Sequence, residues 1–405
     1  MVQQKVKYTD TERTPAERAR ALLEEMTLDE KMAQLGCIFP FGDSYDDMEQ
    51  QALEMPYGIG QVSTLEMRRI GTLEEAAGWQ RKMQETVMRQ SPHHIPAIFH
   101  MEGLCGAFIQ EGTSFPSGIA RGSGWDPELE EKIAKVVAKQ EAACGITHIL
   151  APVLDISRDS RMGRQGETYG EDPALAAALG AAYTKGIQTT EAGGRRPESV
   201  AKHFLGFHNS QGGIHGTNSD TPSRLMEEIY GKPFQSAISE SELKGVMPCY
   251  NSIDGEPASV SHRLLTELLR EKMGFDGLCV SDYGGINNAH EVQRIGETIG
   301  ETGLLAMEAG MDIEMPKATG YGEELKEMFR SGQADTELLD RTVLRVLEAK
   351  FRMGLFEHPF AMDGESCQKI FEEKEGAELS FRSARESMVL LKNNGILPLS
   401  GKIKK

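Results

Sequence analysis

The chain has 405 residues, with 44 Lys or Arg against 62 Asp or Glu, which gives a formal net charge of −18. No basic cluster offsets this charge, so we do not expect nucleic acid or an anionic membrane surface as a partner. No segment approaches the roughly 20 apolar residues of a membrane helix. The opening MVQQKVKYTDTERTP also lacks the apolar run of a secretory signal. We therefore expect a cytoplasmic globular protein.

Motifs that bind metals or phosphates are missing from the sequence. The six cysteines form no CxxC pair and HExxH does not occur, so we interpret the cysteines as reduced thiols rather than zinc ligands. Neither GxxxxGK[ST] nor GxGxxG occurs, which removes the usual nucleotide-binding hypotheses. We expect no cofactor and no metal.

Capping signals predict several helices along the chain. Thr27 and Glu30 have the spacing of a capping box. Two Asp-Pro pairs each place an N-cap residue before a proline at the first helical position. With the glycines that follow them, these pairs predict helices over 126–145 and 172–186. Two further segments with helical periodicity predict helices over 261–274 and 338–354.

Short apolar runs alternate with these helices, which is the pattern of a parallel sheet. The runs are 58–65, 95–102, 146–155, 199–207, 245–254, 277–285 and 309–315. Seven or eight such units without a dinucleotide fingerprint favour a (β/α)8 TIM-type barrel, not necessarily a regular one, over a doubly wound sheet. The barrel domain is predicted to span residues 1–356. The polar, acidic stretch after Gly354 reads as a linker.

Polar residues gather at the carboxyl ends of the apolar runs, the end that carries the site in parallel α/β folds. They are Glu102, Asp155 with Arg158, Lys202 with His203, Tyr250, Asp282 and Glu314. Any one of them could simply cap a loop or complete an ion pair. Their coincidence at one end favours a functional site.

Three of these segments have a chemical interpretation beside a structural one. Asp282 is either an N-cap or a nucleophile or base, since a glycosidase that retains configuration needs one ionised carboxylate to attack the anomeric carbon. Lys202 and His203 are either structural partners or donors to sugar hydroxyls. They can share one site only at an irregular strand end, because successive strand residues face opposite sides. The arginines of ISRDSRMGRQGETYGEDP mostly predict a salt-bridged loop, in which one arginine could clamp a substrate diol.

The chain resembles the amino-terminal barrel of glycoside hydrolase family 3 over roughly residues 10–356. The matching pieces occur in the family's order and are IPAIFHMEGLCG, APVLDISRDSRMGRQGETYGEDP, VAKHFLGF and NSIDGEPASVSHRLLTELLREKMGFDGLCVSDYGGI. The resemblance implies an exo-acting retaining β-glycosidase that removes terminal β-D-glucosyl or β-D-xylosyl residues from an oligosaccharide or β-glycoside. It implies that Asp282 is the nucleophile, that Tyr250 lies close to it, and that the sugar hydroxyls are bound by Glu102, Arg158, Lys202 and His203.

The sequence departs from the family pattern inside the barrel. Many family β-glucosidases carry aspartate at the position of Glu102, and glutamate there is more similar to the β-xylosidase branch. Met162 replaces the aromatic residue usual in the arginine loop, and Tyr283 stands where many members have tryptophan.

The acid/base is the largest departure. In two-domain members it comes from a second, α/β sandwich domain, and SARESMVLLKNNGILPLS resembles the segment that enters this domain. We therefore predict that 357–405 is a linker with the truncated start of that domain, and that a second domain or subunit supplies the acid/base. One alternative is a non-catalytic or truncated sugar-binding barrel. Another is a β-N-acetylglucosaminidase, although Leu205 and Phe207 occupy the proline and histidine positions of its motif.

Overall fold

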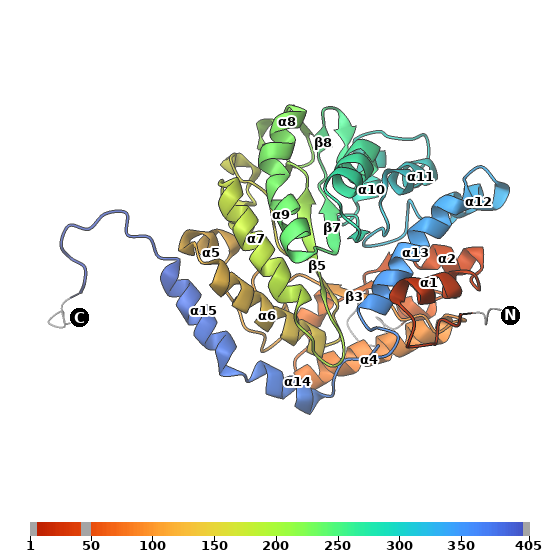
Figure 1. Cartoon of the computed structure of the whole chain (residues 1–405), viewed down its shortest axis with the longest axis horizontal. Helices are drawn as coiled ribbons and strands as arrows, with labels where there is room; N and C mark the ends of the chain where they lie inside the picture. Colours follow the sequence, from red (N-terminus) through yellow and green to blue (C-terminus); the bar gives the residue numbers. More distant parts are fainter. Residues whose placement is uncertain (1–5, 42–49, 400–405) are drawn as a thin grey trace.

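The computed structural model describes residues 6–41 and 50–399. Within them, one sheet of seven parallel strands has the order β1-β2-β3-β4-β5-β7-β10. Figure 1 shows β3, β5 and β7 of this sheet among the helices. The strands are β1 (Cys37–Ile38), β2 (Gln61–Ser63), β3 (Ile98–Met101), β4 (His148–Ile149), β5 (Glu198–Phe204), β7 (Gly245–Pro248) and β10 (Leu278–Cys279).

The eighth position of the barrel is filled by an extended segment rather than by a full strand. Ile313 forms a parallel bridge with Val280, just after β10. The N–H of Glu314 then donates to the carbonyl of Leu35, just before β1, at 3.0 Å. This segment therefore connects the last strand to the first, and the predicted (β/α)8-type barrel is confirmed in an irregular form.

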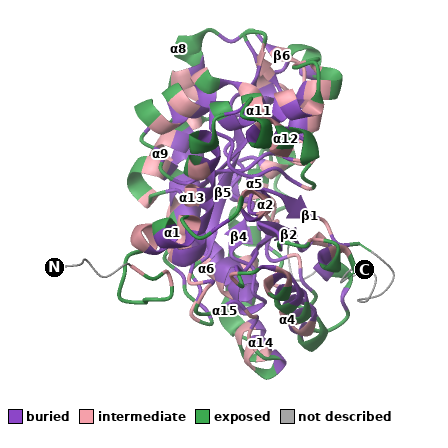
Figure 2. Ribbon diagram, turned by 90° about the vertical axis from the view of Figure 1, so that its right-hand side faces the viewer, coloured by how far each residue is buried: buried purple, intermediate pink, exposed green. Residues whose placement is uncertain are grey.

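Helices surround the strands, and the buried residues lie between the two layers (Figure 2). They are α1 (Pro15–Leu23), α2 (Leu28–Ala33), α4 (Leu73–Gln90), α5 (Gly118–Gly124), α6 (Pro127–Ala143), α7 (Pro173–Gln188), α8 (Ser223–Leu225), α9 (Lys232–Ser241), the helical segment Arg263–Lys272, α10 (Gly285–Asn287), α11 (Ile299–Ala309), α12 (Glu323–Ser331) and α13 (Thr336–Arg352). No helix in the described part of the chain is both long and apolar enough to span a bilayer.

The helix starts expected from capping signals are confirmed. Glu30 Oε2 accepts the N–H of Thr27 at 2.8 Å in a complete capping box. Asp126 caps α6 through the N–H of Leu129 at 3.0 Å. The end of α7 differs from the expectation: it continues two residues beyond Gly186, to Gln188. A Cβ on Gly186 would lie 2.4 Å from the carbonyl oxygen of Glu131, so this glycine serves helix packing instead of ending the helix.

The linker expected for residues 357–405 is corrected over its first part. Helices α14 (Gly364–Phe371) and α15 (Lys374–Glu386) pack along the outside of the barrel against α4, α5 and α6. Cys367 and Leu379 are buried in these contacts because both helices have an apolar face, which the acidic composition obscured. From Met388 to Leu399 the chain has no regular structure and its side chains are exposed. The start of a second domain stays a prediction.

Lys350 of α13 generates a prediction about stability. Its side chain is fully buried, and its ammonium donates to Gln34 Oε1 at 2.6 Å without an ion pair among the described residues. Burial lowers the pKa of Lys350 to about 7, whereas an unfolded lysine has a pKa of about 10.4. The unfolded state therefore binds more protons between these values, and this group's contribution to stability improves as pH rises through that window.

Lys350→Met should consequently raise the free energy of unfolding, and the gain should be about 2–3 kcal/mol larger at pH 6 than at pH 9. Urea denaturation at the two pH values measures the difference. The matched control is Lys132→Met on the exposed side of α6, which should change stability equally at both pH values. If the effect of Lys350→Met on stability did not depend on pH, the lowered pKa of the buried Lys350 would be contradicted.

Candidate active site

Five of the six residues expected at the site lie at or just after the carboxyl ends of four strands. Glu102 follows β3, Lys202 and His203 belong to β5, Tyr250 follows β7, and Asp282 follows β10. The carboxyl ends of parallel strands open on the same rim of a barrel. The fold therefore brings together side chains that are up to 180 positions apart in the sequence.

Asp282 has one bonded and one free carboxylate oxygen. Oδ1 accepts the backbone N–H of Tyr283 at 2.7 Å. Oδ2 is buried and has no hydrogen-bond partner in the described chain, and the nearest cationic candidate, His203 Nε2, lies 3.6 Å away. The side chain is 14% exposed. A buried polar atom without a partner costs free energy, and a catalytic role is one reason for keeping it.

Lys202 and Glu102 form an ion pair beside this carboxylate. Nζ of Lys202 lies 2.6 Å from Oε2 of Glu102, and the lysine is buried while the glutamate is partly exposed. The pairing of β5 with β7 shifts register between Lys202 and Phe204. Such a bulge re-aims side chains, and this is the strand irregularity that the adjacent Lys202 and His203 require to serve one site.

His203 is held as a neutral imidazole. Arg164 Nη2 lies 3.2 Å from Nε2 of His203, and since a guanidinium can only donate, Nε2 accepts. Nδ1 then carries the proton and donates to Asp155 Oδ2 at 2.7 Å. Burial lowers the pKa of His203 well below its usual value. Burial also raises the pKa of Asp155 to about 6, against the opposing charges of His208 and Arg164.

The arginine at the site is Arg164, which the sequence interpretation did not select. Its guanidinium forks onto Glu167 with two contacts of 2.7 Å and lies over the Phe207 ring, besides bonding His203. Arg158 is exposed and lines a separate pocket with Trp125 and Glu171. None of the other predicted site residues lines that pocket, so the structure does not bring Arg158 to them.

The sequence offered little to separate Arg158, Arg161 and Arg164, because they recur every three residues in one polar loop. The only local signal is Glu167, three residues after Arg164, which provides a carboxylate for a bidentate pair. Asp159 likewise provides a carboxylate for Arg161, and the two form an ion pair of 2.6 Å on the exposed side of the loop.

Two tyrosines complete the surroundings of Asp282. The hydroxyl of Tyr250 donates to the carbonyl oxygen of Tyr283 at 2.8 Å. Burial and the charge of Asp282 raise the pKa of Tyr250, so it stays a neutral donor. Tyr283 points into the barrel, where its hydroxyl meets His100 Nε2 and Ser63 Oγ at 2.8 Å each. These contacts fix the backbone directly after Asp282.

The arrangement suits a neutral ligand that is rich in hydroxyl groups. Cationic donors and anionic acceptors of hydrogen bonds surround one carboxylate oxygen that is free to react. A positive charge that develops on a ligand next to this oxygen would be stabilised. In the described residues no group of three or more His, Cys, Asp or Glu is placed to hold a metal ion.

Comparisons with known proteins agree with this chemistry. A model described as the glycosyl hydrolase family 3 N terminal domain matches residues 27–349. A β-xylosidase of Formosa agariphila is 33% identical over 322 residues, which cover 75% of this chain and 44% of that protein. A β-glucosidase structure from Erythrobacter marinus superposes with a TM-score of 0.90 at 32% identity, over 97% of this chain and 52% of that one.

A mutant β-glucosidase from Listeria innocua, solved in complex with laminaribiose, superposes with a TM-score of 0.83 at 28% identity. The match covers 94% of this chain and 53% of that one. The chain thus spans about half the length of these relatives.

The contact between Arg164 and His203 can be tested in the free protein by ¹⁵N NMR of the imidazole nitrogens. Between pH 5 and 7, His203 should carry a proton on Nδ1 only. Arg164→Ala removes a nearby positive charge and should raise the pKa of His203. Arg158→Ala serves as the matched control and should leave it unchanged. Equal shifts in the two variants, or a doubly protonated His203 at pH 6, would contradict the arrangement.

Proposed function

We propose, on the premise that this chain belongs to glycoside hydrolase family 3, that it carries the nucleophile of an exo-acting retaining β-glycosidase. The reaction would remove a terminal β-D-glucosyl or β-D-xylosyl residue from an oligosaccharide or β-glycoside. The observation that supports this most directly is the free, buried Oδ2 of Asp282 among paired cations.

In the first step Oδ2 of Asp282 attacks the anomeric carbon, and the bond from this carbon to the leaving oxygen breaks with its electron pair. A glycosyl ester of Asp282 results. Water then attacks the same carbon from the opposite side and gives a proton to the residue that served as the general acid in the first step, while the ester bond breaks and the carboxylate is restored. Two displacements retain the anomeric configuration. The hydrogen bond from Tyr283 N–H to Oδ1 orients the carboxylate so that Oδ2 faces the sugar.

The terminal sugar would be held by the ion pairs around Asp282. Lys202 and Arg164 can donate to hydroxyls while Glu102 accepts, and each stays anchored by its partner as the sugar binds. We place Arg164 in the role that the sequence interpretation gave to Arg158. These contacts would tighten as oxocarbenium character develops on the sugar ring. The relatives include enzymes named for glucose and for xylose, and the proposal covers both sugars.

The acid/base is proposed to come from a second domain or subunit. Among the described residues, three carboxylates near Asp282 already hold a cation or imidazole: Glu102 holds Lys202, Asp155 holds His203, and Glu167 holds Arg164. A general acid instead needs a protonated carboxyl that is free to meet the leaving oxygen.

Asp282→Ala tests the nucleophile. Turnover of an activated aryl β-glucoside or β-xyloside should fall by at least about 10⁴-fold, because covalent catalysis is lost. Azide should partly restore it and yield the α-glycosyl azide, since a single displacement inverts the configuration. The matched control is Asp276→Ala, at an exposed aspartate shortly before β10. An Asp282→Ala chain that keeps its turnover would contradict the proposal. A wild-type chain that binds sugars without turning over any substrate would instead indicate a binding barrel.

The leaving group tests the source of the acid. Without a general acid, aryl glycosides whose leaving groups need no proton should react about 10²–10⁴-fold faster on this chain than alkyl glycosides or disaccharides of the same sugar. Initial rates on matched pairs of substrates measure this ratio. Equal, fast turnover of both types would show that the acid lies within the chain.

A further inference from the structure

Trp125 is placed in a way that does not help folding. It is 67% exposed, whereas the chain's other tryptophan, Trp79, is 4% exposed in the core. Trp125 also ends α5 in the left-handed region, at φ 55° and ψ 32°, where glycine is the usual residue. An exposed indole and a left-handed backbone at a bulky residue both cost folding free energy, which points to a role in binding.

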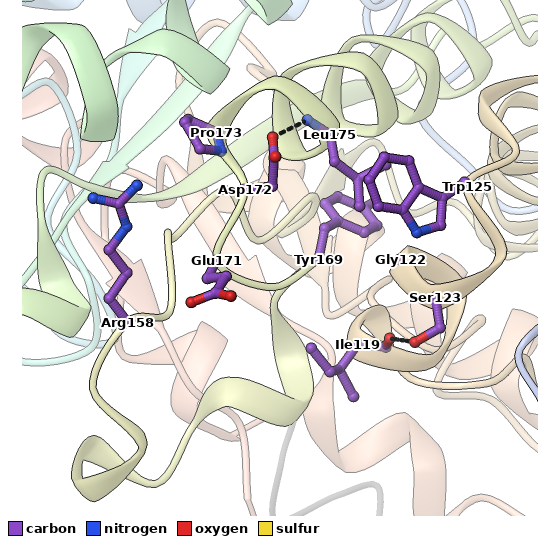
Figure 3. Close-up of a pocket in the computed structure, with 10 residues that line it drawn as sticks. All are labelled: Ile119, Gly122, Ser123, Trp125, Arg158, Tyr169, Glu171, Asp172, Pro173 and Leu175. Atoms are coloured by element: carbon purple, nitrogen blue, oxygen red, sulfur yellow. Dashed lines mark hydrogen bonds between the residues drawn. The ribbon is translucent and has the colours of Figure 1, made fainter. Parts of the chain in front are cut away.

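Trp125 borders a pocket of about 530 Å³, which is also lined by Arg158 and Glu171 from the loop that carries Arg164. This volume falls within the range of small-ligand sites. Figure 3 shows the indole near Leu175 and Tyr169 on one side of the pocket, and Arg158 with Glu171 on the other. The pocket thus sets an apolar face opposite charged groups.

Arg158 and Glu171 are both available to a ligand. The other two arginines of the loop are paired, Arg161 with Asp159 at 2.6 Å and Arg164 with Glu167 at 2.7 Å. Within residues 6–41 and 50–399, Arg158 and Glu171 form no hydrogen bond or ion pair, even with each other. Arg158 and Glu171 both line the pocket, and their side chains offer a ligand guanidinium N–H donors and carboxylate acceptors.

We propose that this pocket is a second saccharide-binding site, which holds a pyranose unit of a β-linked oligosaccharide away from Asp282. The C–H face of the ring would stack on the Trp125 indole, while its hydroxyls would accept from Arg158 and donate to Glu171. An anion would meet the Glu171 charge and a cation would meet Arg158, so the mixed lining favours a neutral polyol. The choice of a saccharide rests on the proposed function.

The two sites are close enough to hold parts of one oligosaccharide or to share one substrate pool. Arg158 and Arg164 are six residues apart in the same loop, so their Cα atoms are separated by at most roughly 22 Å. A saccharide held at Trp125 would raise the local concentration of chain ends near Asp282.

Tryptophan fluorescence can report on this site, because Trp79 is buried out of reach of a saccharide and only the emission of Trp125 should change on binding. The Asp282→Ala protein, which prevents turnover, is titrated with laminaritetraose and with xylotetraose. At least one should give a saturable blue shift of the emission. Trp125→Asn, chosen because asparagine tolerates the left-handed region, should abolish the shift without lowering the melting temperature. Arg158→Ala should weaken binding at least about 10-fold. The matched control Arg161→Ala should leave affinity unchanged.

Three results would overturn the inference. The first is an emission that neither tetrasaccharide changes. The second is tetrasaccharide binding, followed by calorimetry, that Trp125→Asn and Arg158→Ala leave intact. The third is an indole that acrylamide cannot quench in the ligand-free protein, since Trp125 would then contact protein instead of saccharide. If Asp282→Ala still hydrolysed aryl glycosides while the titration behaved as expected, the proposed function would fail and the second site would stand.

Discussion

The site depends on every cation near Asp282 being held by another carboxylate. Lys202 is paired with Glu102 and Arg164 with Glu167, while burial lowers the pKa of His203 and its Nδ1 donates a hydrogen bond to Asp155. If one of these groups bonded Oδ2 directly, the oxygen would lose both its basicity and its freedom to attack. The pairing thus keeps positive charge close to Asp282, while its Oδ2 has no hydrogen-bond partner among the described residues.

The barrel provides this arrangement through local irregularities. The bulge in β5 turns Lys202 and His203 toward one rim, and Tyr283 anchors the chain after Asp282 through Ser63 and His100. Both devices cost regular pairing or bury polar groups, and buried atoms such as His100 Nδ1 stay without a partner in the described chain. Stability has to come from elsewhere, chiefly the apolar layer between strands and helices.

Local signals in the sequence predicted much of the fold. The capping box at Thr27 and the Asp126-Pro127 start depend on nearest neighbours and were found in place. Strand β1, at Cys37–Ile38, has two residues and carries no periodicity to detect. Helix α14 was taken for linker because its buried face consists of a few residues, among them Cys367 and Phe371, in an acidic stretch.

The choice between Arg158 and Arg164 could not be made locally, since it depends on how a loop without regular periodicity folds back against β5. Residues that follow strands could be located in the sequence because a strand end fixes where they lie. Which arginine of the loop reaches the site could be told only from the folded structure, where Arg164 contacts His203.

The most direct measurement is mass spectrometry of the chain after incubation with 2-deoxy-2-fluoro-β-glycosyl fluorides of glucose and xylose. The fluorine at C2 slows hydrolysis of the glycosyl ester, and the fluoride leaves without a proton, so the ester should accumulate. We expect one added glycosyl unit, located on the peptide that contains Asp282. Labelling of a different carboxylate, or labelling that persists in Asp282→Ala, would contradict the nucleophile assigned to this barrel.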